Sequence, residues 1–319
     1  MAKKKTAFVC TECGADFPKW QGQCPACGAW NTLQEFVVDP ATPKSRGAER
    51  TGYSGELTEV RNLDEIVLEE TPRIGTGMGE LDRVLGGGLV PGSAILIGGH
   101  PGAGKSTLLL QVMCRLADTE SCLYVTGEES LSQVAMRADR LKLPKEKLRL
   151  AAETDVEQIL DLARKERPRL LVVDSIQVMY LAGLQSAPGS VAQVRECAAA
   201  LTRFAKQTGT VLLLVGHVTK EGMLAGPKVL EHLVDAVLTF EGDRFASHRL
   251  LRAVKNRFGA THELGLFEMQ SGGLAEVGNP SELFLSDARA SGVATIVACE
   301  GTRSLVVDLQ ALVNVTSYA

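Results

Sequence analysis

Short apolar runs alternate with amphipathic segments through the middle of the chain. Four of these runs are continuously apolar, as expected of strands that are buried on both faces, and they lie at 94–98, 122–126, 170–173 and 211–216. Helical patterns lie between or beside them, at 106–117, 130–141, 155–166 and 190–206. This alternation predicts an α/β fold with a mainly parallel sheet covered by helices.

The pattern changes after residue 211. Strand-like segments follow one another closely at 234–241, 249–255 and 264–269, which favours an antiparallel extension of the sheet. Two more runs, at 292–299 and 305–313, are joined by Glu300-Gly301-Thr302-Arg303. The segment that contains these two runs is too short to bury a stable hydrophobic core of its own. We therefore expect residues 276–319 to be the start of a domain that is cut short.

Compositional breaks divide the rest of the chain. Residues 1–36 are rich in cysteine, and residues 37–60 have few large apolar side chains and many Pro, Gly, Ser and Thr. A stretch of this kind cannot bury a core, so it is interpreted as a flexible linker. Residues 61–275 carry the alternating pattern and are expected to form the main domain.

Charge and cysteine content limit the class of protein. The net charge of −4 argues weakly against a nucleic-acid binder but leaves room for a local basic stripe. No apolar run reaches the length of a membrane span, and the Met1 end lacks the apolar part of a secretory signal. Cysteines outside the first module are expected to be small buried hydrophobes in a reducing cytoplasm: Cys114, Cys122, Cys197 and Cys299.

Two CxxC pairs mark the N-terminal module. Cys10 and Cys13 form one pair, and Cys24 and Cys27 form the other, ten residues further on. Two such knuckles can present four thiolates in the tetrahedral array of structural Zn²⁺. Redox pairs and iron–sulfur ligation are the alternatives. Contacts of the module with DNA, with protein or with the main domain all stay open.

A phosphate-binding loop follows the first strand. The segment matches G-x4-G-K-[ST] between a predicted strand and a predicted helix, the context that supports the motif. Its residues are Gly99, His100, Pro101, Gly102, Ala103, Gly104, Lys105 and Ser106, with Thr107 as a lesser contributor. Backbone N–H groups and the helix N-terminus would bind the phosphates of ATP, with Lys105 on the β and γ phosphates and Ser106 on Mg²⁺.

Carboxylates follow two later strands. Asp174 ends the apolar run 170–173, as in a Walker B strand, where it would hold Mg²⁺ through water; a simple helix cap is the alternative. Glu128 and Glu129 follow the run 122–126. Glu128 is our first choice for the residue that orients the attacking water, and Glu129 is second. The alternative is that both belong to the first turn of a helix, with Ser130 well placed as its N-cap.

Three segments together resemble one family. LDRVLGGG at 81–88 followed by Pro91-Gly92 is similar to the segment before the phosphate loop in RecA-like ATPases. KNRFG at 255–259 and the four-cysteine module are features of the bacterial RadA (Sms) family. The resemblance covers nearly the whole chain. It implies a RecA-like core followed by a Lon-protease-like domain that begins near Asn279-Pro280-Ser281. It also implies a hexameric DNA-dependent ATPase that binds single-stranded and branched DNA and works with RecA in branch migration.

The KNRFG segment also has a direct physical interpretation. Between 244 and 262 there are five Lys or Arg residues and no Asp or Glu. Lys255 and Arg257 are two apart, so on a strand they would share a face and could clamp a γ-phosphate of their own or a neighbouring subunit. A solvated basic strand and a contact with DNA phosphates are the alternatives.

Channel loops and a phosphate sensor follow from the resemblance. The first DNA loop would span 179–190 and the second 219–229, where Lys220 and Lys228 are candidates for backbone phosphate contacts. His217 ends the preceding strand and is the candidate sensor of the γ-phosphate; a satisfied core histidine is its alternative.

Three functions compete at this point. The first is a DNA-dependent ATPase motor. The second is a nucleotide-gated scaffold or loader that recruits a partner through the cysteine module. The third is a KaiC-like phosphotransferase, which the module and the single ATPase copy disfavour. Glu128 together with Lys255 and Arg257 favours hydrolysis.

Overall fold

The computed structural model describes most of the chain. The described residues are 5–10, 16–17, 19–25, 28, 30–38, 62, 72–184, 186–216, 229–242, 247–285 and 291–311. The interpreted linker at 37–60 lies almost wholly outside these residues. Within the described part, no helix is long and apolar enough to cross a membrane.

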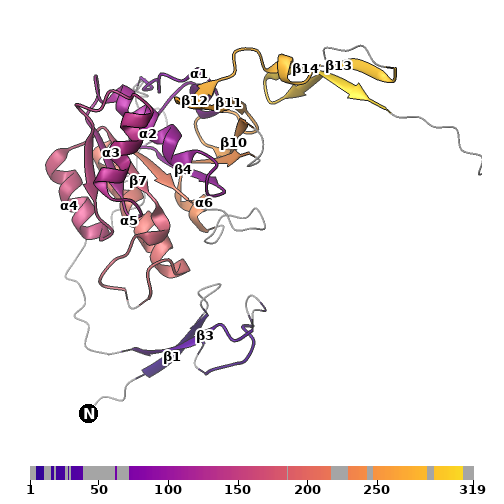
Figure 1. Ribbon diagram of the computed structural model, residues 1–319. Coiled ribbons are helices and arrows are strands. Elements are labelled where there is room, and N and C mark those ends of the chain that lie inside the picture. The colour runs from indigo at the N-terminus through magenta and orange to yellow at the C-terminus, as the bar shows by residue number, and fades with distance from the viewer. Residues whose placement is uncertain are drawn as a thin grey trace, which may run out of the picture.

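A nine-stranded sheet forms the centre of the main domain (Figure 1). Its order is β12-β11-β10-β9-β4-β8-β7-β5-β6. The six strands from β9 to β6 in this order are parallel: β9 (Ala236–Glu241), β4 (Ala94–Gly99), β8 (Val211–Val215), β7 (Leu170–Asp174), β5 (Cys122–Thr126) and β6 (Arg149–Ala152). Three strands extend the sheet in antiparallel fashion: β10 (His248–Asn256), β11 (Leu264–Gln270) and β12 (Gly273–Glu276).

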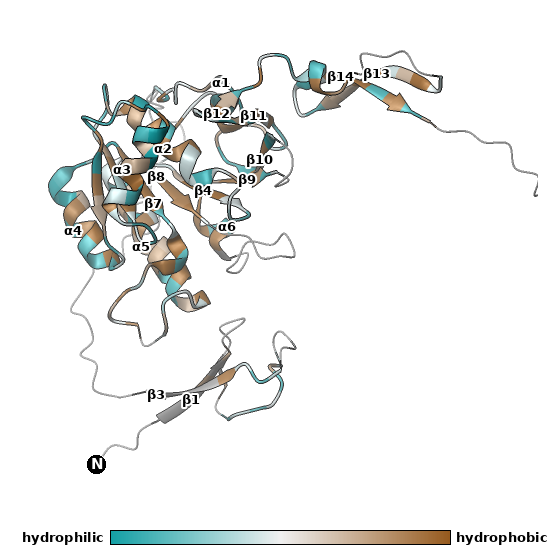
Figure 2. Cartoon of the chain, in the orientation of Figure 1, coloured by the Kyte–Doolittle hydropathy of each residue, from teal (hydrophilic) through white to brown (hydrophobic). Residues whose placement is uncertain are grey.

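Alternate strand residues enter two separate cores. Ile95 and Ile97 pack in one cluster, whereas Leu96 packs in the other, because successive side chains of a strand point to opposite faces. The helices on the first face are α1 (Gly79–Leu85), α2 (Lys105–Leu116) and α3 (Leu131–Arg140). Those on the second are α4 (Val156–Glu166), α5 (Val191–Thr208) and α6 (Val229–Leu233). Figure 2 shows the apolar central strands between these helices, so the predicted α/β class is confirmed.

The expected strands and helices agree with the observed ones to within a few residues, and the antiparallel extension after 211 is present. In the described part of the main domain, four short α-helices and strands were missed: α1, α6, β6 and β12; the three strands of the N-terminal module were not predicted either. The reason is plain for β6, because its residues are exposed or half-buried and leave no continuous apolar run. α6 has only five residues, too few to show a helical period.

Two of the signature segments touch each other in the fold. Gly86 ends α1 in the left-handed conformation, with φ 81°. A Cβ atom on Gly86 would lie 3.0 Å from the Cα atom of Gly259 in the KNRFG segment, so the two backbones meet at van der Waals distance. The side-chain amide of Asn256 donates to the carbonyl of Val84, 3.3 Å away. Asn256 and Gly259 therefore hold the end of β10 against α1.

The N-terminal module is a small three-stranded sheet. Its strands β1 (Lys5–Cys10), β2 (Asp16–Phe17) and β3 (Leu33–Val38) pair in the order β2-β1-β3. Cys10, Cys24 and Leu33 are buried together. Gly28 has φ 75°, and its N–H donates to the carbonyl of Cys24 at 2.8 Å, so the chain turns sharply at this glycine.

A two-stranded hairpin, β13 (Val293–Glu300) and β14 (Arg303–Gln310), follows the main domain. Its turn lies against α1 and the start of β11, where the guanidinium of Arg303 binds both carboxylate oxygens of Glu80 at 2.6 and 2.8 Å and the carbonyl of Leu264 at 3.2 Å. The expectation that Cys299 is buried is wrong, because it lies on this thin hairpin, which also exposes Ile296 and Val297. The other three scattered thiols are buried, and burial raises the pKa of Cys122 to about 12.

Candidate nucleotide-binding site

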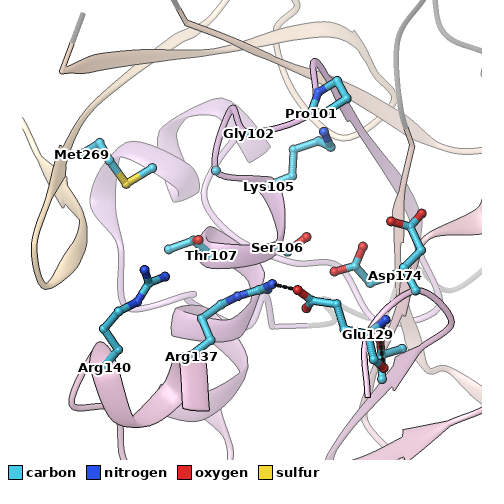
Figure 3. Close-up of a pocket in the computed structure, with 13 residues that line it drawn as sticks. Pro101, Gly102, Lys105, Ser106, Thr107, Glu129, Arg137, Arg140, Asp174 and Met269 are labelled. Carbon is cyan, nitrogen blue, oxygen red and sulfur yellow. Dashed lines mark hydrogen bonds and ion pairs between the residues drawn. The ribbon is translucent and has the colours of Figure 1, made fainter. Parts of the chain in front are cut away.

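The phosphate loop connects β4 to α2 (Figure 3). Gly104 caps α2 with φ 110°, and a Cβ atom there would lie 2.9 Å from the terminal methyl of Met269, so only glycine fits. α2 starts at Lys105, which leaves the first N–H groups of the helix at the loop. This geometry favours an anion at the mouth of the helix.

The side chain of Lys105 is buried beneath the loop. Its amine donates to the carbonyl oxygens of Gly99 at 2.7 Å and His100 at 2.9 Å. Burial lowers the pKa of Lys105, and the nearby carboxylates of Asp174 and Glu128 partly offset that effect. The fold therefore places this amine beside the two carboxylates that the sequence selected.

Asp174 ends the buried strand β7. Its carboxylate accepts a hydrogen bond from the hydroxyl of Tyr124 on β5, with 2.5 Å between the oxygens. Burial, together with Asp174, raises the pKa of Tyr124 well above its usual value, so the hydroxyl stays protonated and remains a donor. Sequence reasoning missed Tyr124, which only the pairing of β5 with β7 brings next to Asp174.

Glu128 and Glu129 have different partners. The carboxylate of Glu128 accepts a hydrogen bond from the hydroxyl of Ser175, whereas Glu129 forms an ion pair with Arg137 on α3. Ser130 is the N-cap of α3, as expected, and its hydroxyl accepts from the N–H of Gln133. The helix begins after both glutamates, so the alternative that they belong to its first turn is wrong.

These residues surround one pocket of about 430 Å³. The residues that line it are Pro101, Gly102, Gly104, Lys105, Ser106, Thr107, Thr126, Glu128, Glu129, Arg137, Arg140, Asp174 and Met269. Figure 3 shows Arg137 extending from α3 toward Glu129, and Arg140 one turn further along. The i,i+3 spacing of the two arginines was visible in the sequence and could have flagged them. Met269 could not be foreseen, because β11 reaches the pocket only through the order of the sheet.

Lys255 and Arg257 are placed differently. The described residues that line the pocket include neither of them. The amine of Lys255 donates to the carbonyl of Val234, 2.7 Å away, and to that of Glu231, and burial lowers its pKa. Arg257 pairs with the buried carboxylate of Asp235 at 2.9 Å, while its own side chain is 54% exposed. A clamp on the phosphate of the same chain is thus not favoured by this geometry.

Several expected site residues lie outside the described part of the chain. They are the cysteines Cys13 and Cys27, the sensor candidate His217, and the loop lysines Lys220 and Lys228. Roles for these residues remain predictions.

Comparison with known proteins agrees with the two modules. A family model described as an AAA domain matches residues 76–223, and one described as a rubredoxin metal-binding domain matches residues 8–35. A protein from Haemophilus influenzae named DNA repair protein RadA is 60% identical over 98% of this chain and 69% of its own length. Proteins of the same name from Escherichia coli and Bacillus subtilis are 58% and 50% identical, over 69% and 70% of their lengths and 98% and 100% of this chain.

The chain belongs to the RadA family. The predicted resemblance is thereby confirmed. The AAA match covers the phosphate loop, Glu128 and Asp174, and the second match covers all four cysteines of the N-terminal module. The chain therefore has an AAA-type ATPase domain and an N-terminal zinc-ribbon domain, as a member of this family.

Proposed function

We propose that this chain hydrolyses ATP to drive DNA processing in recombinational repair. The observation that carries the proposal is the convergence of Lys105, Asp174 and Glu128 on one pocket at the start of α2. The start of α2 supplies Lys105, the loop after β5 supplies Glu128 and the end of β7 supplies Asp174, so their meeting is a property of the fold and not of a local motif.

Each residue has a proposed role. Backbone N–H groups of the loop and the N-terminus of α2 would bind the phosphates, with Lys105 on the β and γ groups. The oxygen donors of Ser106 and Asp174 fit Mg²⁺, which when bound would neutralise charge on the transferring phosphate. Tyr124 would fix the carboxylate of Asp174 in place.

Glu128 is the proposed general base. Glu129 is neutralised by the guanidinium of Arg137, whereas Glu128 is exposed at the pocket and is oriented by the neutral hydroxyl of Ser175. Because Arg137 engages the carboxylate of Glu129, the exposed carboxylate of Glu128 is better placed to accept a proton from water in the pocket. Glu128→Gln should therefore bind nucleotide but lose turnover, whereas Glu129→Gln should keep turnover when ATP is saturating; the reverse result would exchange the two roles.

DNA handling is proposed from the family alone. Relatives are named DNA repair proteins. We propose that the chain binds single-stranded and branched DNA through Lys220 and Lys228, and that His217 couples DNA binding to the γ-phosphate of ATP. We further propose that it acts with RecA in branch migration. The proposed working form is a homo-hexamer in the cytoplasm. The assignment of residues 276–319 to the start of a Lon-protease-like domain stays a prediction as well.

Zinc is proposed for the N-terminal module. Cys10 and Cys24 are buried side by side in its small core, and thiolates are the ligands that structural Zn²⁺ prefers. With Cys13 and Cys27 they would make a closed four-thiolate site. Metal analysis should find one zinc per chain, lost in Cys24→Ser; a folded wild-type protein without metal would refute the proposal.

The deciding experiment measures ATP turnover with and without single-stranded DNA. A DNA-dependent ATPase should show turnover that rises when DNA is added and that disappears in Lys105→Ala. Nucleotide binding without turnover in either condition would favour the alternative of a nucleotide-gated scaffold or loader, because hydrolysis would then have no part in its work.

A further inference from the structure

Arg137 occupies an unusual position at the nucleotide pocket. Its side chain is only 17% exposed, and one of its guanidinium nitrogens pairs with Glu129. The other terminal nitrogen, Nη1, is buried and has no hydrogen-bond partner within the described part of the chain. A buried cationic N–H without a partner is costly, so this guanidinium is only partly satisfied by the protein itself.

The surroundings indicate what the missing partner is. Arg137 lines the same pocket as Lys105, Ser106 and Thr107, and Figure 3 shows its guanidinium between the start of α2 and Glu129. Guanidinium groups bind phosphate oxygens in a fork geometry. Because the ion pair with Glu129 already restricts the side chain of Arg137, less conformational entropy is lost when the guanidinium binds an anion.

We propose that Arg137 is a phosphate ligand of the bound nucleotide and that Glu129 is the positioning residue that holds it ready. The inference rests on the proposed nucleotide binding and deepens it. The two neighbouring glutamates then have different functions: Glu128 orients the attacking water, and Glu129 positions the guanidinium of Arg137.

A simpler account competes with this one. Arg137 could serve only to neutralise Glu129, which would otherwise repel the phosphates. The two accounts differ in the Glu129→Gln background, where no charge remains to be neutralised. Arg140 provides a matched control, because it lies on the same helix and lines the same pocket but is exposed.

The test is a set of binding titrations with fluorescent ADP and with a fluorescent, slowly hydrolysed ATP analogue. The variants are Arg137→Gln, Glu129→Gln, their double variant, Arg137→Lys and Arg140→Gln, each checked for folding by circular dichroism. We expect Arg137→Gln to weaken binding about tenfold or more, as loss of a charged hydrogen bond should, and Arg140→Gln to have a much smaller effect. The double variant should stay as weak as Arg137→Gln. Comparison of the two nucleotides shows whether the contact needs the terminal phosphate.

Other outcomes overturn the proposal. If the double variant binds as tightly as Glu129→Gln, Arg137 only neutralises its partner. If Arg140→Gln weakens binding as much as Arg137→Gln, the effect is general charge. If Arg137→Gln does not fold, Arg137→Lys decides, because wild-type affinity in that variant would show that the guanidinium fork is not needed. Wild-type protein that binds no nucleotide would overturn the proposed function itself, a result separate from all of these.

Discussion

Lys105 and Lys255 make the same kind of hydrogen bonds but have different charged neighbours. Each amine donates to two backbone carbonyls, and burial lowers the pKa of each. Around Lys105 the next charges are the carboxylates of Asp174 and Glu128, whereas the charges around Lys255 are mixed: the cations of Arg257 and Lys206 and the carboxylates of Asp235 and Glu231. Lys105 lines the proposed nucleotide pocket, whereas Lys255 belongs to a mixed cluster of charges that does not line it.

The comparison shows that the surroundings of a lysine, and not its residue type, decide which role it can have. The phosphate loop is local, since strand, glycines and helix follow one another along the chain. The KNRFG segment depends on the fold, because Lys255 and Arg257 contact the α6–β9 junction while Asn256 and Gly259 contact α1. The side chain of Arg257 is 54% exposed and does not line the described pocket, and its action on the nucleotide of a neighbouring subunit stays a prediction.

Lys105→Ala should have the largest effect, because the β and γ phosphates lose their fixed counter-ion. We expect ATP turnover to vanish in an assay of phosphate release at saturating ATP. Lys147→Ala is the control, since that exposed amine only pairs with Asp118 and its loss should leave turnover intact. Near-normal turnover in Lys105→Ala would end the assignment of the phosphate loop.

Arg257→Ala should come second. If Arg257 acts on the neighbour's nucleotide, turnover should fall by about 10³- to 10⁵-fold while nucleotide binding is kept. Lys206→Ala is the matched control, because Lys206 also pairs with Asp235, at 3.0 Å, but has no proposed part in the chemistry. An equal loss of turnover in both variants would mean that Arg257 only supports Asp235.

Mixing Arg257→Ala with Lys105→Ala separates the remaining possibilities. Mixed assemblies contain interfaces at which an intact phosphate loop meets an intact Arg257, so some activity should return. Assembly and subunit exchange must first be confirmed by light scattering. Mixed assemblies without any recovery would assign Arg257 to its own subunit or to DNA.

Tyr124→Phe tests the inside of the phosphate pocket. Loss of the buried hydroxyl that donates to Asp174 should cost about 1–3 kcal/mol in the free energy of unfolding at neutral pH. The pKa of Tyr124 is raised in the folded protein, so its contribution is fully present below the ordinary tyrosine pKa of 10.0 and is lost as pH rises above it. Urea unfolding at pH 7 and above pH 10 measures this, with the half-buried Tyr180→Phe as control; a difference that grows with pH would contradict it.

Lys255→Met should have the smallest effect. It removes two hydrogen bonds to carbonyls near the end of α6, worth about 1–2 kcal/mol together for a half-buried group. The melting temperature should fall by a few degrees, whereas Lys165→Met on the exposed side of α4 should not change it. An unchanged melting temperature in Lys255→Met would mean that these bonds exchange with water at no cost.

Much of this protein could be predicted from the order of its residues. Strands of continuous apolar residues, the glycines and Lys105 of the loop, and the strand-terminal Asp174 are visible because each depends on neighbours within a few positions. The two CxxC pairs and the KNRFG segment pointed to the RadA family for the same reason.

Tertiary structure decided which of these residues meet. Tyr124 reaches Asp174 because β5 pairs with β7, and Met269 reaches the loop because β11 lies in the extension of the same sheet. The partners of Glu128 and Glu129 differ because α3 starts just after them and carries Arg137 back over the pocket. Tyr124 and Asp174 are fifty residues apart in the chain, and Glu129 and Arg137 are eight apart. No local pattern encodes their distances, which are set only when the strands take their order and the helices pack on the two faces of the sheet.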